Sequence, residues 1–252
     1  MRWCRVDQAK ISNIESGRIG VSEERIRRLA TFYACADVEL IEAMCAIARE
    51  RRGQFWWEEY RGILSPDFLD MAELEHHAAS MRSLQIVSMP GLLQTEDYAR
   101  ALFSGVVPKL PAAEIEARVE HRMRRRDVFA KEDPPHLHAL IHEAALRMRF
   151  GGRSVARTQL EYIKKVAEWP HVTVLVIPFT NEQFIEATQP VLYAGGAVPQ
   201  LDTVRLDSPI GGQFLDAEAE LHRYRTLLDA AEDTALSAAE SEQIIHHIGR
   251  EL

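Results

Sequence analysis

The sequence predicts an α+β protein, with an all-α part at its start and a larger part that combines helices with a mixed sheet. Two observations predict this class. Before residue 50, apolar residues recur at helical spacing behind capping residues. After residue 136, two apolar runs flank a helical segment, which is the pattern of a βαβ unit. We place the domain boundary in the polar stretch that ends at Gly53, so the predicted domains are residues 1–53 and 54–252.

The composition is that of an ordinary globular protein, with 46% hydrophobic and 27% charged residues among 252. The formal net charge of −8 is unevenly distributed. Residues 1–28 hold seven Lys/Arg and four Asp/Glu, whereas the remainder holds 23 Lys/Arg and 34 Asp/Glu. Because an acidic surface repels phosphate, we expect contact with nucleic acid only near the start of the chain.

Cysteine usage and hydropathy indicate a cytoplasmic protein. Cys4, Cys35 and Cys45 follow no disulfide or metal spacing, so we expect reduced thiols, with Cys35 and Cys45 buried as small apolar side chains. The chain has no run of eighteen apolar residues, and no signal-peptide core follows Met1. We therefore expect no membrane association.

A short helix is predicted between Asp7 and Gly17. Asp7 is a good N-cap, and Gly17 suits the left-handed residue that ends a helix. Ile11 and Ile14 share one side of a helical wheel and would pack. The other side carries Gln8, Ala9, Ser12 and Asn13. Two further helices are predicted to begin after Ser22 and Asp37.

The larger part is predicted to begin with a helix that Ser65-Pro66 opens and that reaches Met81. A short strand is expected from Leu84. Thr95 is expected to cap the next helix, whose first turn holds Glu96 and Asp97, two acids that stabilise the positive end of the helix dipole.

A longer helix, from about Ala112 to Phe129, is expected to bury Ile115, Val119 and Met123. Its outer side would carry Arg118, Arg122, Arg124, Arg125 and Arg126. Two interpretations of the run at residues 122–126 stay open. It could contact phosphate or an acidic partner, or it could be a solvated helix face that neighbouring glutamates dilute.

The βαβ unit is predicted from a strand at Leu137–Ile141, a helix at Val155–Glu168 and a strand at Val172–Ile177. Further strands are expected at residues 191–194 and 203–206. Gly195-Gly196 and Gly211-Gly212 are interpreted as turns between strands. Two helices close the chain.

A capping box is predicted where Ser237 opens the second of these helices and Glu240 follows three residues later.

Residues 7–18 resemble the recognition helix of the Cro/C1-type (XRE-type) helix-turn-helix, which lies in the major groove behind a supporting helix. The resemblance implies that the base-facing positions are those of Gln8, Ala9 and Asn13, with Lys10 and Ser12 near phosphate. The full predicted DNA-binding set is Gln8, Ala9, Lys10, Ser12, Asn13 and Arg18. Because only six residues precede Asp7, we expect the two upstream helices of that domain to be missing.

The rest of the chain resembles the C-terminal domain of an actinobacterial group of Cro/C1-like regulators. The resemblance lies in the segments 89–102, 143–147, 169–179 and 224–228, and the string Pro-Gly-Leu-Leu-Gln-Thr-Glu-Asp-Tyr-Ala is its most specific part. It implies an antitoxin-like transcriptional regulator whose partners are double-stranded DNA, a small partner protein and a second copy in a homodimer. The biochemical role of the C-terminal domain in that group is uncertain.

An aromatic cluster is the first candidate for a binding pocket. Trp56, Trp57 and Tyr60 could line one, with Gln94 and Tyr98 contributing, although core packing is the commoner role of such clusters.

Histidines at alternate positions are a candidate metal site. His136, His138 and His142 would share one face of a strand, but the outer two would lie about 20 Å apart, too far to share one ion. We therefore predict no metal site and no cofactor.

Common catalytic signatures are absent from the sequence: it has no Gly-x-Ser-x-Gly elbow, Walker loop, dinucleotide fingerprint or His-Glu-x-x-His motif. We therefore predict no catalytic residues and expect that the protein is not an enzyme. Two alternatives to a DNA-binding regulator stay open. The chain could be an interaction module that holds a small partner without binding DNA, or a small-molecule-binding protein or enzyme built on a regulator scaffold.

Overall fold

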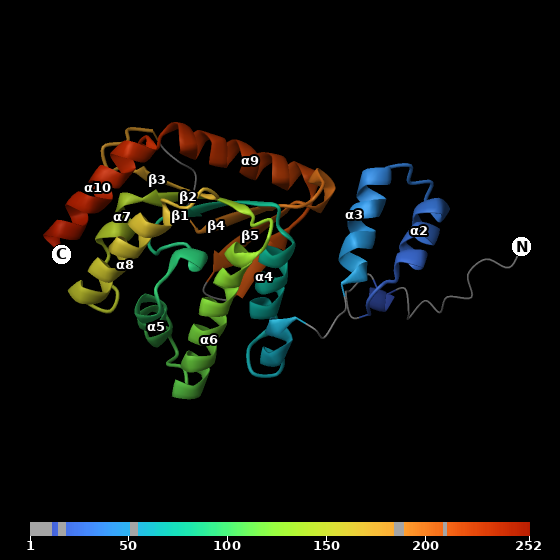
Figure 1. Cartoon of the computed structure of the whole chain (residues 1–252), viewed down its shortest axis with the longest axis horizontal. Coiled ribbons are helices and arrows are strands. Elements are labelled where there is room, and N and C mark those ends of the chain that lie inside the picture. Colours follow the sequence, from blue (N-terminus) through green and yellow to red (C-terminus); the bar gives the residue numbers. More distant parts are fainter. Residues whose placement is uncertain (1–11, 15–18, 51–54, 184–188, 209–210) are drawn as a thin grey trace, which may run out of the picture. The chain divides into compact units, whose positions relative to one another are not determined.

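The computed structural model describes residues 12–14, 19–50, 55–183, 189–208 and 211–252 (Figure 1). The chain divides into two compact units, Met1–Glu58 and Glu59–Leu252, here called unit 1 and unit 2. Among the described residues, no helix is long and apolar enough to cross a membrane.

Unit 1 contains α2 (Glu23–Phe32) and α3 (Val38–Arg49). Both helices begin where the sequence predicts. The Ser22 side chain accepts a hydrogen bond from the Arg25 amide, and Asp37 accepts one from the Leu40 amide. The Cys45 thiol is fully buried, as expected, whereas Cys35 is only partly buried. Cys4 lies outside the described residues.

Charged side chains join the two helices of unit 1. Arg27 donates to Glu23 on its own helix and to Glu42 on α3, and Arg49 of α3 donates back to Glu23. These side chains are exposed, so the network orients the two helices but adds little to the stability of the pair.

Unit 2 is built on a six-stranded mixed sheet with the order β3-β2-β1-β4-β5-β6. Its strands are β1 (Ser80–Gln85), β2 (His136–His142), β3 (Val172–Ile177), β4 (Val191–Gly195), β5 (Thr203–Ser208) and β6 (Gly211–Leu215). β1, β2 and β3 are parallel, and β4, β5 and β6 continue the sheet in antiparallel fashion from the other side of β1. The chain is therefore α+β, and the predicted βαβ unit is confirmed.

Helices cover both faces of this sheet (Figure 1). In chain order they are α4 (Pro66–His77), α5 (Glu96–Ser104), α6 (Ala112–Arg124), α7 (Glu143–Arg147), α8 (Arg153–Val166), α9 (Glu218–Asp233) and α10 (Ala238–Glu251). Short 3₁₀ turns lie at η1 (Trp56–Tyr60), η2 (Gly91–Leu93), η3 (Arg125–Ala130) and η4 (Pro199–Leu201).

The alternation of side chains along each strand creates two cores. Met81, Leu137 and Ala139 face one side of the sheet and pack with residues of α5, α7, α8 and α10. Leu84 and Leu140 face the other side and pack with residues of α9. The central strands β1 and β2 thus contribute buried side chains to both cores. The β-branched run of β3 predicts a strand buried on both faces, but β3 lies at the edge of the sheet and its Thr173 is exposed.

Four local predictions are wrong in detail. The helix predicted to reach Met81 ends at His77, and the strand expected from Leu84 already begins at Ser80. Residues 80–85 form a strand despite the local helical periodicity, because β1 hydrogen-bonds to two neighbouring strands at once. Gly211-Gly212 is no turn but opens β6, paired with β5. The helix predicted to reach Phe129 changes to 3₁₀ geometry at Arg125.

Two capping predictions have different outcomes. Ser237 and Glu240 form the predicted capping box at the start of α10. Thr95 occupies the N-cap of α5 as predicted, but its side chain makes no capping hydrogen bond.

Candidate functional site

The predicted DNA-reading residues lie at the edge of what the structure describes. Residues 12–14 are helical, with Ser12 exposed and Asn13 partly buried. The Asn13 carbonyl accepts a hydrogen bond from the Ile19 amide, so this turn connects directly to the segment that leads into α2. Gln8, Ala9, Lys10 and Arg18 lie outside the described residues. The base-reading role of the whole set stays a prediction.

Unit 2 contains a polar cavity of about 230 Å³ between α4, η2, α6 and one face of the sheet. It is smaller than the roughly 300–1,000 Å³ pockets that hold drug-sized ligands. Apolar side chains line part of it: Met71, Met89, Leu92, Leu102, Leu137 and Leu192. Its polar lining includes three arginines: Arg122, Arg125 and Arg205.

The floor of the cavity is a row of side chains across three strands. Ser83 of β1 is paired with Leu192 of β4, which is paired with Arg205 of β5. Since side chains alternate along a strand, Gln85 and Asp207 point to the same face two residues further on. All five residues line the cavity. The hydroxyl of Ser83 accepts a hydrogen bond from the Gln85 amide over 3.1 Å, so the polar groups on β1 support each other.

Arg125 and Glu75 form a buried ion pair at the wall of the cavity. The guanidinium donates through Nε over 2.6 Å and through Nη2 over 2.5 Å to the two carboxylate oxygens. The two side chains are only 6% and 3% exposed. Burial lowers the pKa of Arg125, but the charge and hydrogen bonds of Glu75 outweigh it and leave that pKa raised. The charges of Arg125 and Glu75 therefore balance each other.

Arg122 differs because it has no carboxylate partner within the described part of the chain. Its Nη1 donates over 2.6 Å to the amide oxygen of Gln94, and its Nε is buried without an acceptor. Burial, together with the charge of Arg125, lowers the pKa of Arg122 to about 9. The guanidinium stays protonated at neutral pH, so the cavity wall holds a positive charge that no direct ion pair balances.

Arg205 is shared between two carboxylates. Its Nη2 lies 2.8 Å from Asp67 of α4 and its Nη1 lies 2.8 Å from Asp207 on its own strand. A side chain on Gly212 would collide with both Arg205 and Asp67, because its Cβ would lie only 2.5 Å from the Asp67 carboxylate. The small residue on β6 thus makes room for this pair.

The segment around Gly91 is fixed by buried hydrogen bonds. Gln159 of α8 is fully buried, accepts from the Thr95 amide and donates to the Leu93 carbonyl, each over 2.7 Å. Gln94 in turn donates to the Met89 carbonyl. With its amide group oriented in this way, Gln94 presents its oxygen to Arg122.

Gly91 itself permits the close approach of the arginines. A Cβ on this residue would lie 3.0 Å from Nη2 of Arg125 and 3.3 Å from Nη1 of Arg122. Both guanidiniums therefore converge on one point above the Gly91 backbone.

The residues that the sequence offered as a pocket fall in different places. Gln94 lines this cavity. Tyr98 does not line it but is buried behind it, where its hydroxyl accepts from the Met89 amide. Trp56 and Trp57 belong to unit 1, and their rings meet edge to face. Tyr60 belongs to unit 2, where its ring contacts His121.

The alternating histidines lie on β2 as predicted, but their contacts differ. His138 lies 3.3 Å from Glu232 of α9, and Nδ1 of His142 accepts from the Ala144 amide at the start of α7. His136 is exposed at the start of the strand. The three side chains therefore lie in different surroundings.

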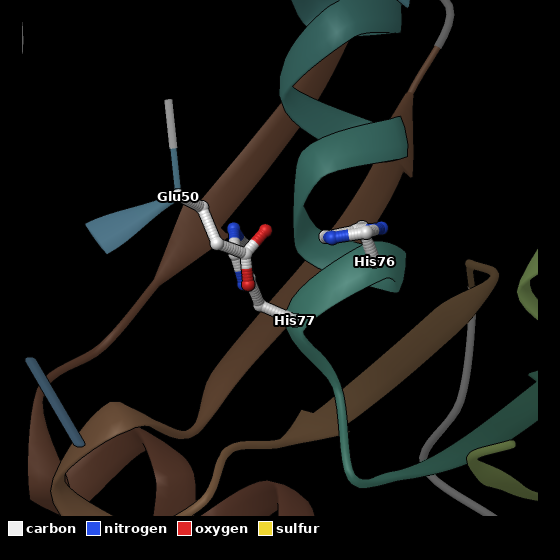
Figure 2. Close-up of side chains that lie close together, drawn as sticks. All are labelled: Glu50, His76 and His77. Carbon is white, nitrogen blue, oxygen red and sulfur yellow. The ribbon is translucent and has the colours of Figure 1, made fainter. Parts of the chain in front are cut away.

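Two more histidines, His76 and His77, end α4 and carry their side chains at its last turn (Figure 2). Their rings are 4.9 Å apart and nearly perpendicular. Glu50, also labelled there, belongs to unit 1. Two imidazoles alone do not supply the three or four protein ligands of a zinc site, so we assign none to this pair.

Of the two interpretations of the arginine run at residues 122–126, the solvated helix face is wrong for Arg122 and Arg125. Arg122 and Arg125 turn into the cavity, while Arg124 pairs with Glu59 and Arg126 donates to Tyr162. A signal for this existed in the sequence. Arg118, Arg122 and Arg125 are spaced four and three residues apart, so they share one stripe of the helix.

Aromatic contacts explain how that stripe is accommodated. Arg118 lies over the Phe68 ring and Arg122 over the Phe103 ring, at 4.9 and 5.0 Å. Glu75 and Gln85, which also belong to the polar lining, carried no sequence signal of their own.

Comparisons with known proteins bear on both units. A family model described as a domain of unknown function (DUF5753) matches residues 68–247, which include every strand of the sheet and the whole cavity lining. A model described as a helix-turn-helix domain matches residues 1–44. No curated protein and no solved structure matches the chain.

Proposed function

The chain belongs to the DUF5753 family and begins with a helix-turn-helix domain, and on that basis we propose that it is a Cro/C1-type transcriptional regulator that binds double-stranded DNA as a homodimer. The helix-turn-helix match makes the chain a DNA-binding regulator in the general sense. The finer assignment, to the Cro/C1 type, draws its support from the residue pattern at positions 7–18.

The observation that carries the proposal is the agreement between this match and the helices of unit 1. The matched residues 1–44 include α2 and most of α3, each with its predicted N-cap. In a dimer, two recognition helices would enter successive major grooves, and the affinity would fall steeply with salt because phosphate contacts release counterions.

Charge supports DNA contact through unit 1 alone. Unit 2 holds 20 Lys/Arg and 29 Asp/Glu, a formal charge of −9, whereas unit 1 holds ten and nine. In this proposal unit 2 does not catalyse a reaction. It binds a small partner protein in an antitoxin-like role, and the protein acts in the cytoplasm.

Replacement of Asn13 tests the DNA-reading assignment. Duplexes selected from a random pool by the unaltered protein provide the specific site. Since an Asn amide suits an adenine edge, Asn13→Ala should weaken binding to that site by about 1–3 kcal/mol and change binding to random duplex little. Gel-shift titrations measure both, with Gln243→Ala, an exposed residue of α10, as the matched control.

Equal losses on both duplexes would contradict a base-reading role for Asn13. If the unaltered chain selects no sequence from the pool, the interaction-module alternative gains. Analytical ultracentrifugation of the protein with and without the duplex tests the homodimer.

A further inference from the structure

The cavity of unit 2 has the chemistry of a binding site, and its charge distribution indicates the class of ligand. Two of its three arginines are already paired: Arg125 with Glu75, and Arg205 with Asp67 and Asp207. Arg122 alone faces a neutral acceptor, the amide of Gln94. Arg122 is partly buried and has no direct carboxylate partner in the described part of the chain, so the carboxylate of a ligand would form with it the ion pair that the other two arginines already make.

The site around this charge is built rather than accidental. Gln94 is 2% exposed and is oriented by its own bond to the Met89 carbonyl. The neighbouring backbone is held by the fully buried Gln159, and Gly91 leaves space where both guanidiniums converge. Rigid support of this kind is what holds a binding group in a defined position.

The remaining lining limits the ligand further. Glu75 and Asp207 also line the cavity beside the arginines, so it does not carry the excess positive charge that a phosphate dianion requires, and a single carboxylate adds less repulsion. The apolar side chains of Met71, Leu92, Leu102 and Leu192 offer contact to an uncharged hydrocarbon part. A volume of about 230 Å³ restricts the ligand to a small molecule.

We propose that this cavity binds a small organic monocarboxylate, with its carboxylate at Arg122 and its apolar chain between α4, α5 and the sheet. The ligand oxygen supplies the acceptor that the guanidinium lacks. This site goes beyond the proposed DNA binding and does not depend on it, because every residue that forms it lies in unit 2.

Calorimetric titration of the full chain with hexanoate tests the proposal, with hexan-1-ol and inorganic phosphate as comparison probes. We expect saturable binding of hexanoate that is at least about tenfold tighter than that of the alcohol, which has the same carbon number, or of phosphate. That ratio corresponds to one charge-assisted hydrogen bond.

Variants of Arg122 locate the binding. Arg122→Gln should weaken hexanoate binding at least about tenfold, and Arg122→Lys, which keeps the charge, should weaken it less. Arg157→Gln, on the exposed face of α8, is the matched control and should bind as the unaltered protein does. If Arg122→Gln does not fold, the probe comparison on the unaltered chain and the Arg122→Lys variant decide.

Four results would overturn the proposal: no saturable binding of hexanoate below about 10 mM, equal affinity for hexan-1-ol, tighter binding of phosphate, or unchanged affinity in a folded Arg122→Gln variant. None of these measurements involves DNA, so a failure here is distinguishable from a failure of the proposed regulator function.

Discussion

Glu75 and Arg125 show how much a single residue can matter in unit 2. Glu75→Gln would leave the Arg125 guanidinium buried without its counterion, and breaking a buried pair in this way costs about 3–5 kcal/mol. Urea unfolding should show a lower midpoint at an unchanged slope. Glu59→Gln provides the control, because Glu59 pairs with Arg124 at the surface and its loss should leave the free energy of unfolding near that of the parent.

A second residue, His121, predicts how stability depends on pH. Its ring is fully buried between Tyr60 and Phe68, and burial together with nearby arginine charges lowers its pKa to about 3. In the unfolded chain the same imidazole takes up its proton near pH 6.5. Between these two pKa values the unfolded state therefore binds more protons than the folded state. The free energy of unfolding thus has its full contribution from His121 above pH 6.5 and loses it as the pH falls towards 3.

Unfolding measured across this range should show a contribution of about 1.4 kcal/mol per pH unit from His121. His121→Phe, which keeps an aromatic ring, should flatten that dependence. An NMR titration in which the His121 ring protonates near pH 6.5 in the folded state would contradict the assignment.

The arginines also mark the limit of what residue patterns predict. Their spacing places Arg118, Arg122 and Arg125 on one helix stripe, but their charge is compatible with a solvated face as well as with a binding surface. Which stripe faces the core depends on partners distant in sequence: Glu75 on α4 and Gln94 beyond η2. Sequence spacing along one helix contains no information about those partners.

At the scale of elements, the segment from η2 to α5 depends on a helix more than fifty residues later. Gln159→Leu would remove both hydrogen bonds that Gln159 makes to Leu93 and Thr95, leaving the buried Leu93 carbonyl and the partly buried Thr95 amide without this partner. We expect a loss of about 2–4 kcal/mol in the free energy of unfolding.

Hydrogen exchange should report faster exchange of the Thr95 amide in this variant. Gln243→Leu, on the exposed side of α10, is the matched control and should change neither quantity. An unchanged exchange rate of the Thr95 amide in the Gln159→Leu variant would show that the conformation of the segment from η2 to α5 does not depend on Gln159.

Elements with strong local signals were predictable, and those defined by pairing were not. The caps at Ser22, Asp37 and Ser237 and the β-branched run of β3 gave their elements directly. β1 has the sequence Ser-Met-Arg-Ser-Leu-Gln, which follows no clear alternation. Its strand state comes from its neighbours β2 and β4, and tertiary context decides such cases.

At the scale of the whole molecule, the division into two compact units predicts that the chain unfolds in two steps. Calorimetry of the full chain should show a small transition for unit 1 and a larger one for unit 2, since enthalpy scales with the number of residues. Cys45→Asp places a charge in the buried site of unit 1 and should lower only the first transition. Leu84→Ala, in the core of unit 2, should lower the free energy of unfolding of unit 2 by about 2–5 kcal/mol and so lower the temperature of the second transition only.

A single transition that both variants shift equally would contradict independent unfolding. The α+β class itself was predictable from the sequence, because helical periodicity dominates before residue 50 and strand patterns appear only later. The strand order was not, because no local pattern tells β4 to pair with β1.

The position of β1 between a parallel and an antiparallel neighbour has a consequence for synthesis on the ribosome. β1 pairs with β2 on one side, and Ser80 pairs with Gly195 of β4 on the other. For most of translation, one edge of β1 therefore has no partner, and an unpaired edge is prone to pair with other chains. This edge of β1 therefore stays open to pairing with other chains until β4 has left the exit tunnel.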